Sequence, residues 1–292
     1  MLSLDKMKIA KRVALQYYKL KFGLLGIFVP EKAVSYAFEL FCTPYSGKPK
    51  RIVPLIFENA ENIDVETFGN ITLRGWCWQP DESVSNGKKI LILHGFDSCA
   101  YKFEKYIRPL KKLGFTLYAF DAPGHGISDG TTINSLQYKN AILKIEDKFG
   151  SFYGIIAHSI GGLAVSLATE KLSNLDKLVL IAPAVEITRP IESFAKMVGL
   201  SKKIKELFYA HIINIGGYPI SYYDSRRAIN QVNIKTLWLH DKEDKICPFE
   251  DIESFIKTNS EHITFYITNG LGHSNIYREA MIIKEIVNFF VQ

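Results

Sequence analysis

Cysteine is scarce in this chain of 292 residues, and no two cysteines stand in a CxxC pair. The four cysteines are Cys42, Cys77, Cys99 and Cys247. Disulfide frameworks are typical of short chains rich in cysteine, and structural zinc sites use closely spaced pairs of ligands. The cysteines of this chain are few and widely spaced. The sequence therefore argues against both kinds of cross-link and favours a reducing compartment.

Long apolar runs are also missing. The longest run near the start of the chain, Phe22–Val29, is far shorter than the about 20 apolar residues that a membrane-spanning helix needs. No small-x-small cleavage site of a signal peptide follows it. We therefore expect a cytoplasmic protein, with peripheral contact to a membrane left open.

A basic surplus is absent from most of the chain. The net charge is +6, but residues 1–51 hold ten Lys and Arg against three acidic residues, so the remainder is close to neutral. Enzymes that act on nucleic acids usually carry basic residues around their site. We expect no nucleic-acid partner.

The basic segment itself predicts an amphipathic helix over residues 4–21. One side carries the polar residues Asp5, Lys8, Arg12, Gln16 and Lys19, and the other carries Met7, Ala10, Val13, Ala14 and Tyr17. Two interpretations remain open. The favoured one is a helix packed on the protein with its lysines in water. The alternative is an interfacial helix that makes weak contact with an anionic membrane surface.

The rest of the chain predicts a mostly parallel sheet flanked by helices. A second helix is predicted over Glu31–Phe41, a loop or linker over 45–50, and a hairpin from the alternating strands Ile63–Phe68 and Ile71–Trp78. Apolar runs typical of buried strands follow at Lys89–His94, Phe115–Asp121, Tyr153–His158, Leu178–Ala182, Thr236–His240 and Ile263–Ile267. Helical segments lie between them, near 99–113, 133–149, 161–173, 249–258 and 275–290.

One interval is too long for a simple connection. More than fifty residues separate Ala182 from Thr236, whereas helix–strand connections are usually short. We interpret residues 184–231 as a helical cap inserted after the sixth strand. The expected domains are an N-terminal helical extension over 1–50, a core over 51–183 and 232–292, and this cap.

Ser159 follows an apolar strand and precedes a glycine pair that opens a helix, in the run Ile155–Gly162. Small residues two before and two after the serine, Ala157 and Gly161, are typical of a nucleophile elbow, although the first position is usually glycine. An ordinary strand-to-helix turn with a capping serine is the alternative.

A serine nucleophile needs a base and an orienting acid, and two later loops supply candidates. His273 lies in a glycine-flanked segment after the final strand, and Asp244 follows the strand before it. Asp241 and Glu243 are rivals for the acid. The order Ser, Asp, His is that of the α/β-hydrolase arrangement.

On these residues the chain resembles an α/β-hydrolase of the serine esterase or lysophospholipase-like type, close to the serine aminopeptidase-like group. The stretches that carry the resemblance are His94–Phe96, Asp121–Ser128, the elbow, the Asp244 loop and the His273 loop. The resemblance implies the α/β-hydrolase fold and a triad of Ser159, Asp244 and His273. It also implies an oxyanion hole made by the backbone N–H groups of Phe96 and Ile160.

No metal or cofactor is expected. The other six histidines have no ligand spacing, and His94 and His125 are expected to hydrogen-bond backbone. The run Gly124–Gly130 places its third glycine one residue too late for a dinucleotide fingerprint.

The leading hypothesis is a serine hydrolase that cleaves a small-molecule carboxylic ester with a hydrophobic acyl group. Aromatic residues of the expected cap could line its pocket or could pack between the cap and the core: Phe194, Phe208, Tyr209, Tyr218, Tyr222 and Tyr223. The alternatives are an amide or peptide hydrolase, for which Glu186, Glu192 and Asp224 are candidates to hold a substrate amine, an acyltransferase or thioesterase, and a non-catalytic membrane-associated scaffold.

Overall fold

The computed structural model describes residues 2–49, 51–258 and 261–292, with side chains described from residue 12 onward. The chain forms two compact units. The helical unit combines the chain up to Thr43 with Glu186–Tyr223, and the sheet unit combines Pro44–Val185 with Asp224–Gln292. Each unit is described by itself.

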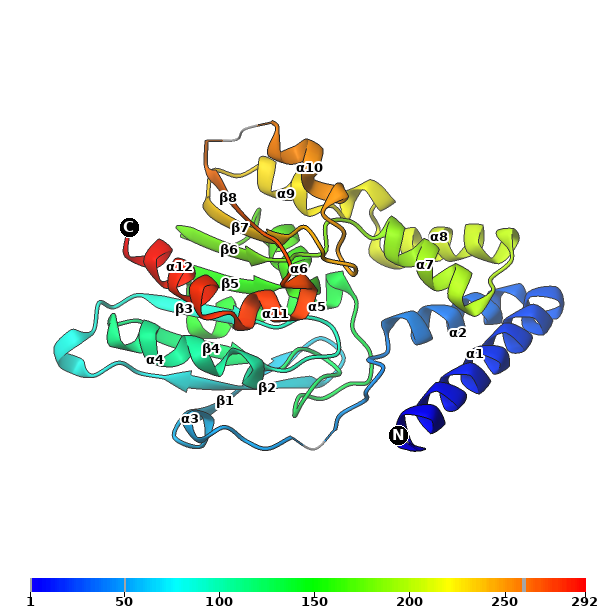
Figure 1. Ribbon diagram of the computed structural model, residues 1–292, viewed down its shortest axis with the longest axis horizontal. Coiled ribbons are helices and arrows are strands. Elements are labelled where there is room, and N and C mark those ends of the chain that lie inside the picture. The colour runs from blue at the N-terminus through cyan, green and yellow to red at the C-terminus, as the bar shows by residue number, and fades with distance from the viewer. Residues whose placement is uncertain (1, 50, 259–260) are drawn as a thin grey trace. The chain divides into compact units, whose positions relative to one another are not determined.

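The sheet unit contains, within the described residues, one sheet of eight strands in the order β1-β2-β4-β3-β5-β6-β7-β8 (Figure 1). The pairs β1–β2 and β2–β4 are antiparallel, and all other neighbours are parallel. The strands are β1 (Glu61–Thr67), β2 (Ile71–Trp78), β3 (Lys89–Leu93), β4 (Thr116–Phe120), β5 (Gly154–His158), β6 (Lys177–Ile181), β7 (Lys235–Asp241) and β8 (Ile263–Thr268).

Helices cover both faces of this sheet because successive strand residues point to opposite sides. In β3, Ile90 and Ile92 pack with α3 (Leu55–Glu58), α4 (Glu104–Lys112) and α12 (Ala280–Val291). Leu91 and Leu93 face the other way. That side is covered by α5 (Ser135–Phe149), α6 (Ile160–Ala168), α9 (Ser225–Asn230) and α10 (Glu250–Ile256). The central strands are buried on both faces, which explains their continuous apolar runs.

The helical unit is built from α1 (Leu2–Phe28), α2 (Pro30–Cys42), α7 (Thr188–Val198) and α8 (Lys202–Gly216). Pro30 begins α2 at the position where a missing N–H breaks no helical hydrogen bond. The ring of Phe41 on α2 lies 5.2 Å from Phe194 and 5.8 Å from Phe208. Phe194 and Phe208 are therefore buried and packed inside this unit against a helix of the N-terminal segment, a partner that the sequence did not indicate.

The predicted sheet flanked by helices is confirmed, and every predicted strand lies within one or two residues of an observed one. The helix predicted over 4–21 runs further, to Phe28, and Val13 and Tyr17 on its expected packed side are exposed. Residue 1, residue 50 and the side chains before residue 12 lie outside the described part of the chain. Among the described residues no helix is both long enough and apolar enough to cross a membrane.

Short helices account for two further differences. The segment 99–113 begins as a 3-10 turn, Ala100–Phe103, and the helix α4 follows it. The last predicted helix, 275–290, is divided into α11 (Gly272–Asn275), the 3-10 turn Ile276–Arg278 and α12. Further 3-10 turns lie at Glu82–Val84 and Ile220–Tyr222.

Candidate active site

The carboxyl ends of the parallel strands carry the candidate residues on four separate loops. Ser159 follows β5, Asp244 follows β7, His273 follows β8 and Phe96 follows β3. In open α/β sheets this edge is where ligands bind, because the connecting loops converge there.

The backbone at Ser159 is strained. Its φ of 55° and ψ of −123° lie in a region that residues with a side chain rarely adopt. The turn is held by three backbone hydrogen bonds. The N–H of Ser159 donates to the carbonyl of Ile181, and the carbonyl of Ser159 accepts from the N–H groups of Leu163 and Ala184. Such strain persists only where the surroundings fix it, and it is concentrated at functional sites.

Glycines make this turn possible because neighbouring backbone lies close to them. A Cβ on Gly161 would stand 2.7 Å from the carbonyl oxygen of His94, and one on Gly162 would stand 2.6 Å from Cβ of Pro183. Real Cβ atoms do not approach other atoms so closely, so both positions exclude larger residues. The glycine pair after Ser159 therefore serves close packing.

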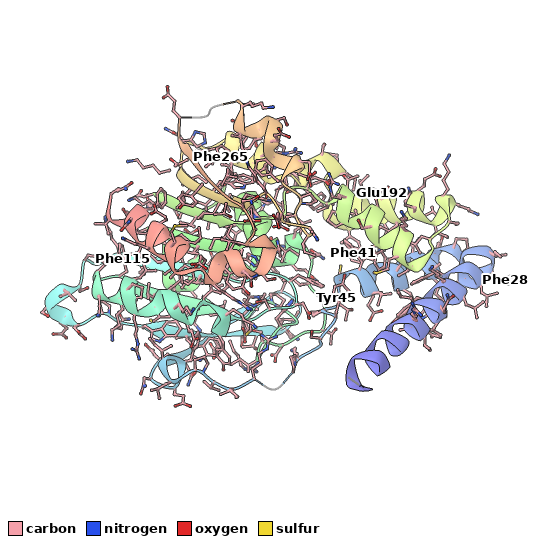
Figure 2. The ribbon with its side chains drawn as sticks, viewed as in Figure 1. Phe28, Phe41, Tyr45, Phe115, Glu192 and Phe265 are labelled. Carbon is pink, nitrogen blue, oxygen red and sulfur yellow. The ribbon has the colours of Figure 1, made fainter. Side chains whose placement is uncertain are left out.

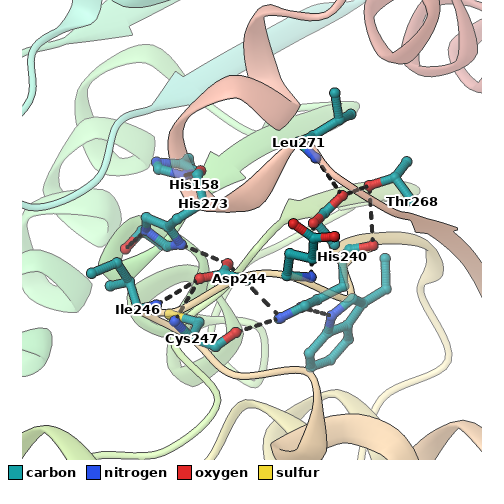
Figure 3. A network of polar contacts seen from close by, with 12 residues as sticks. His158, His240, Asp244, Ile246, Cys247, Thr268, Leu271 and His273 are labelled. Carbon is teal, nitrogen blue, oxygen red and sulfur yellow. Dashed lines mark hydrogen bonds and ion pairs between the residues drawn. The ribbon is translucent and has the colours of Figure 1, made fainter.

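His273 lies between the other two candidate residues. Figure 3 shows its contact with Asp244. Its Nε2 is 3.0 Å from Oγ of Ser159, and its Nδ1 is 2.8 Å from Oδ2 of Asp244. The carboxylate of Asp244 can only accept, so Nδ1 of His273 carries the proton and Nε2 is left to accept one from the serine hydroxyl. This is the arrangement that a general base requires.

Asp244 is fixed by its own turn. Its side chain is fully buried, and its Oδ1 accepts hydrogen bonds from the N–H groups of Ile246 (2.8 Å) and Cys247 (2.9 Å). His240 donates from Nε2 to the carbonyl of Cys247 at 2.7 Å, which holds the same turn (Figure 3). One oxygen of the carboxylate is thus occupied by backbone and the other faces His273.

The rival acids have other positions. Asp241 accepts hydrogen bonds from the hydroxyl of Thr268 (2.6 Å) and the N–H groups of Leu271 (3.0 Å) and Glu243 (2.9 Å). Burial raises the pKa of Asp241, but its hydrogen bonds outweigh this effect and bring the pKa below its ordinary value. Asp241 therefore braces the segment that leads to His273, and the side chain of Glu243 is exposed.

Phe96 and Ile160 were expected to offer backbone N–H groups. Within residues 2–49, 51–258 and 261–292, neither N–H donates a hydrogen bond to another group of the chain. The loop of Phe96 lies against the serine turn, because a Cβ on Gly95 would stand 2.8 Å from Cβ of Ser159. Two free donors beside a serine hydroxyl are suited to stabilise an oxyanion.

Two neutral histidines hold this loop. His94 accepts from the N–H of Ala122 at Nε2 (2.9 Å), and His125 accepts from the N–H of Asp97 at Nε2 (3.0 Å). Their Nδ1 atoms donate to the carbonyls of Gly95 and Pro123, respectively. Burial lowers the pKa of each imidazole to about 4, so both stay neutral at pH 7 and can accept as well as donate.

Comparisons with known proteins bear on the fold and on the class of reaction. The family model described as serine aminopeptidase, S33, matches residues 85–214, which is less than half of the chain. A Mycoplasma pneumoniae protein assigned as an esterase/lipase is 22% identical over 237 residues, which are 69% of this chain and 88% of that protein. The AB hydrolase superfamily protein YisY of Bacillus subtilis is 24% identical over 266 residues, with coverage of 72% and 93%.

A solved structure shares the fold. Est1E of Butyrivibrio proteoclasticus, solved with bound ferulic acid, superimposes with a TM-score of 0.65 at 18% identity, covering 78% of this chain and 98% of Est1E. At that identity the likeness shows the fold alone. The chain belongs to the α/β-hydrolase superfamily. Within it, the relatives place the chain among hydrolases of the esterase/lipase type.

His158 is a residue of this α/β-hydrolase that sequence reasoning treated as structural. Its Nε2 donates to the backbone carbonyl of His273 at 3.0 Å, and its ring lies 4.7 Å from that of His273 and 4.6 Å from that of Tyr277. Burial and the nearby His273 lower the pKa of His158 well below its ordinary value. No signal in the sequence links it to a residue so far along the chain.

The predicted linker of the α/β-hydrolase is attached to the loop of Phe96. Ser46 donates to the carboxylate of Asp97 from both its backbone N–H and its hydroxyl, each at 2.8 Å. The ring of Tyr45 packs edge-on against that of Phe96 at 5.5 Å. Lys48 also donates to the carbonyl of Ser128. This segment thus helps to position the candidate oxyanion loop.

In the described part of the chain, no group of three or more His, Cys, Asp or Glu side chains is arranged to hold an ion. Cys42, Cys77, Cys99 and Cys247 are buried free thiols.

Proposed function

We propose that this α/β-hydrolase cleaves carboxylic esters through an acyl-enzyme on Ser159. The observation that supports the proposal most is the position of His273, within hydrogen-bond distance of both Ser159 and Asp244. The matches to proteins of the esterase/lipase type support the same class of reaction.

In the proposed first step, Oγ of Ser159 attacks the carbonyl carbon of the ester while Nε2 of His273 takes its proton. The N–H groups of Phe96 and Ile160 would donate to the oxyanion that forms. His273, now positively charged and stabilised by Asp244, would return the proton to the departing alcohol. Water would then attack the acyl-enzyme with His273 again acting as the base, which regenerates the serine.

We propose a hydrophobic acyl group as the substrate. The side chains of Phe96 and Ile160, whose N–H groups are the proposed donors, are apolar and only partly buried. An acyl chain bound at the oxyanion site would therefore meet apolar surface. The reaction proposed here needs no metal or cofactor.

The test compares Ser159→Ala with the wild type on p-nitrophenyl acetate and butyrate. The variant is expected to lose about 10⁴-fold or more in kcat, because it has no nucleophile. The matched control is Ser166→Ala. Ser166 is a buried serine on α6, the helix that follows Ser159, and its hydroxyl donates to the carbonyl of Gly162, so this variant should keep its activity. Wild-type turnover by Ser159→Ala would overturn the proposal.

Amide hydrolysis is a weaker candidate because the acidic residues considered for binding a substrate amine are engaged elsewhere. Glu186 accepts from the N–H of Arg189, Glu192 is paired with Lys205 at 2.7 Å, and Asp224 is paired with Arg226. Aminoacyl p-nitroanilides are expected to be poorer substrates than the esters.

Two further candidates are separated by simple assays. Added alcohols or thiols that divert the acyl group away from water would favour an acyltransferase, and acyl thioester substrates test for a thioesterase. A folded protein that a fluorophosphonate probe does not label would favour a non-catalytic scaffold. The membrane contact that was left open for the N-terminal helix does not enter the proposed reaction.

A further inference from the structure

Helix α1 has two apolar faces, and only one of them is packed. On the packed face Phe22 is buried, and Leu25 lies against a cluster that includes Val34 and Ile204. A Cβ on Gly26 would stand 3.0 Å from Cγ1 of Ile204, so the backbone of α1 approaches α8 closely. This face explains how α1 is held in the helical unit.

The other face is a continuous exposed stripe. It consists of Val13, Tyr17, Leu20, Leu24, Ile27 and Phe28, which we call the apolar stripe of α1. The spacing alternates between four and three residues from Val13 to Ile27, and Phe28 follows directly. At 3.6 residues per turn these six side chains share an arc of about 100°. Their exposed fractions run from 51% for Leu24 to 77% for Phe28, which is labelled at the end of the helix in Figure 2.

Single exposed apolar residues are ordinary on protein surfaces, but a contiguous row of six is not. Exposure of this row to water is unfavourable, because hydration of apolar surface raises the free energy of the protein. Such a row therefore points to a surface that another apolar phase covers.

The edges of the stripe carry positive charge and no negative charge. Arg12 and Lys19 flank it on one side of the helix circumference and Lys21 on the other. The sequence contains no acidic residue between Asp5 and Glu31. Nζ of Lys21 lies 4.2 Å from the centre of the Tyr36 ring, so this basic edge also contacts an aromatic side chain of α2.

This charge pattern discriminates between possible occupants. Two copies of α1 paired through their stripes would bring cationic edges together with no acidic partner, which opposes self-association. An anionic lipid surface is complementary, because lysine and arginine stems lie along the apolar region while their charges reach the headgroups. Since α1 is not apolar enough to span a bilayer, the helix would lie in the interface.

We propose that the apolar stripe of α1 is a docking surface for an anionic lipid bilayer. The stripe enters the boundary between headgroups and acyl chains, and the basic edges contact the phosphates. This surface is independent of the proposed hydrolysis, so Ser159→Ala should bind vesicles as the wild type does.

The test is co-sedimentation of the full-length protein with phosphatidylglycerol vesicles and with pure phosphatidylcholine vesicles. The apolar variant is Leu20→Glu/Leu24→Glu/Ile27→Glu. A charge variant replaces Arg12, Lys19 and Lys21 by Gln. The matched control places the same three glutamates on exposed apolar positions of the sheet unit, Phe68→Glu/Val84→Glu/Met281→Glu, whose exposed fractions are 67%, 47% and 53%.

We expect the wild type and the matched control to sediment with phosphatidylglycerol vesicles and only weakly with phosphatidylcholine. The partition coefficient of the charge variant should fall about fivefold per charge removed. The apolar variant should lose at least as much. Circular dichroism and unchanged turnover of p-nitrophenyl butyrate without vesicles would show that the variants fold.

Three outcomes would overturn the proposal. One is wild-type protein that ignores phosphatidylglycerol vesicles, and a second is an apolar variant that binds them as tightly as the matched control. The third is a wild type that forms dimers without lipid and becomes monomeric in the apolar variant, which would assign the stripe to a second copy. A dye attached at Leu24→Cys gives a direct readout, since its emission should shift to the blue only on anionic vesicles.

Discussion

Replacing Gly95 by alanine tests how tightly the candidate active site is packed. A Cβ at this position would stand 2.7 Å from Nδ1 of His158 and 2.8 Å from Cβ of Ser159. The backbone of Gly95 does not have a positive φ, so alanine is opposed by lack of space and not by its own conformation. Both neighbours are held by the serine turn, and neither can swing aside as the end of a long side chain would.

The expected effect has two parts. Overpacking of a buried site destabilises a fold by about 1–3 kcal/mol. To reach an ordinary contact distance the two segments must separate by roughly 1 Å, which moves Ser159 away from Nε2 of His273 or the N–H of Phe96 away from the oxyanion. Misplacement of that size lowers turnover by about 100-fold.

The assay is kcat and KM on p-nitrophenyl butyrate together with thermal unfolding. Gly23→Ala is the control, because no atom lies within 4 Å of the added Cβ and the change should stabilise helix α1 by about 1 kcal/mol. We expect Gly95→Ala to stay folded at 25 °C while kcat falls far more than KM rises. Activity within threefold of the wild type, with Tm unchanged, would refute the close approach of the two loops.

Two further predictions concern histidines around the site. His158→Leu removes the donor to the carbonyl of His273 and should lower kcat about five- to tenfold. His158→Gln keeps an N–H donor and should retain most of the activity. Equal losses of kcat for the two variants in steady-state assays would contradict a positioning role for His158. The folded-state pKa values of about 4 for His94 and His125 lie below the ordinary value of 6.5. Above pH 6.5 both histidines are neutral in the folded and the unfolded protein, and their neutral hydrogen bonds stabilise the fold fully. Between pH 6.5 and pH 4 only the unfolded chain binds the protons, so the free energy of unfolding falls by about 1.4 kcal/mol per pH unit for each histidine. Urea unfolding between pH 7 and pH 5 measures this slope, and His125→Asn should remove one histidine's share.

The sheet was readable from the sequence because its strands are buried on both faces. In the run Lys89–His94 the four residues between the lysine and the histidine are all apolar, so both the existence of the strand and its limits are marked. Short helices carry no such mark. The four-residue helices α3 and α11 are too short to show a 3.6-residue period, and His273, expected on a loop, lies in α11.

The candidate triad was predictable for a related reason. Each of Ser159, Asp244 and His273 lies in a local segment with its own sequence pattern. The order of the three segments along the chain, Ser then Asp then His, indicated that they belong together. His158 and Asp241 were not predictable as supporting residues. Their roles depend on contacts with His273 and Leu271, which are distant in sequence and reach them only after β7 and β8 have paired.

The grouping of the helices depends on long-range contacts as well. The sequence indicated a separate N-terminal extension and a separate cap. In the structure, α1 and α2 share one compact unit with α7 and α8. Ridge-and-groove packing between helices leaves only a periodic apolar pattern in each partner, and that pattern does not say which partner is chosen. The domain boundaries given above therefore stay a prediction.

The geometry at Ser159 bears on whether the site is catalytic. A serine with φ of 55° stores strain of about 1–3 kcal/mol, and no hydrogen bond from its side chain caps α6 in return. Gly161, Gly162 and Gly95 all lie against backbone or side chains that fix this conformation. An ordinary capped turn would relax to an unstrained conformation with the serine hydroxyl on the helix N–H groups. The hydroxyl of Ser159 instead faces Nε2 of His273. A purely structural role for this serine does not explain why its strained backbone directs the hydroxyl to the imidazole and away from the helix.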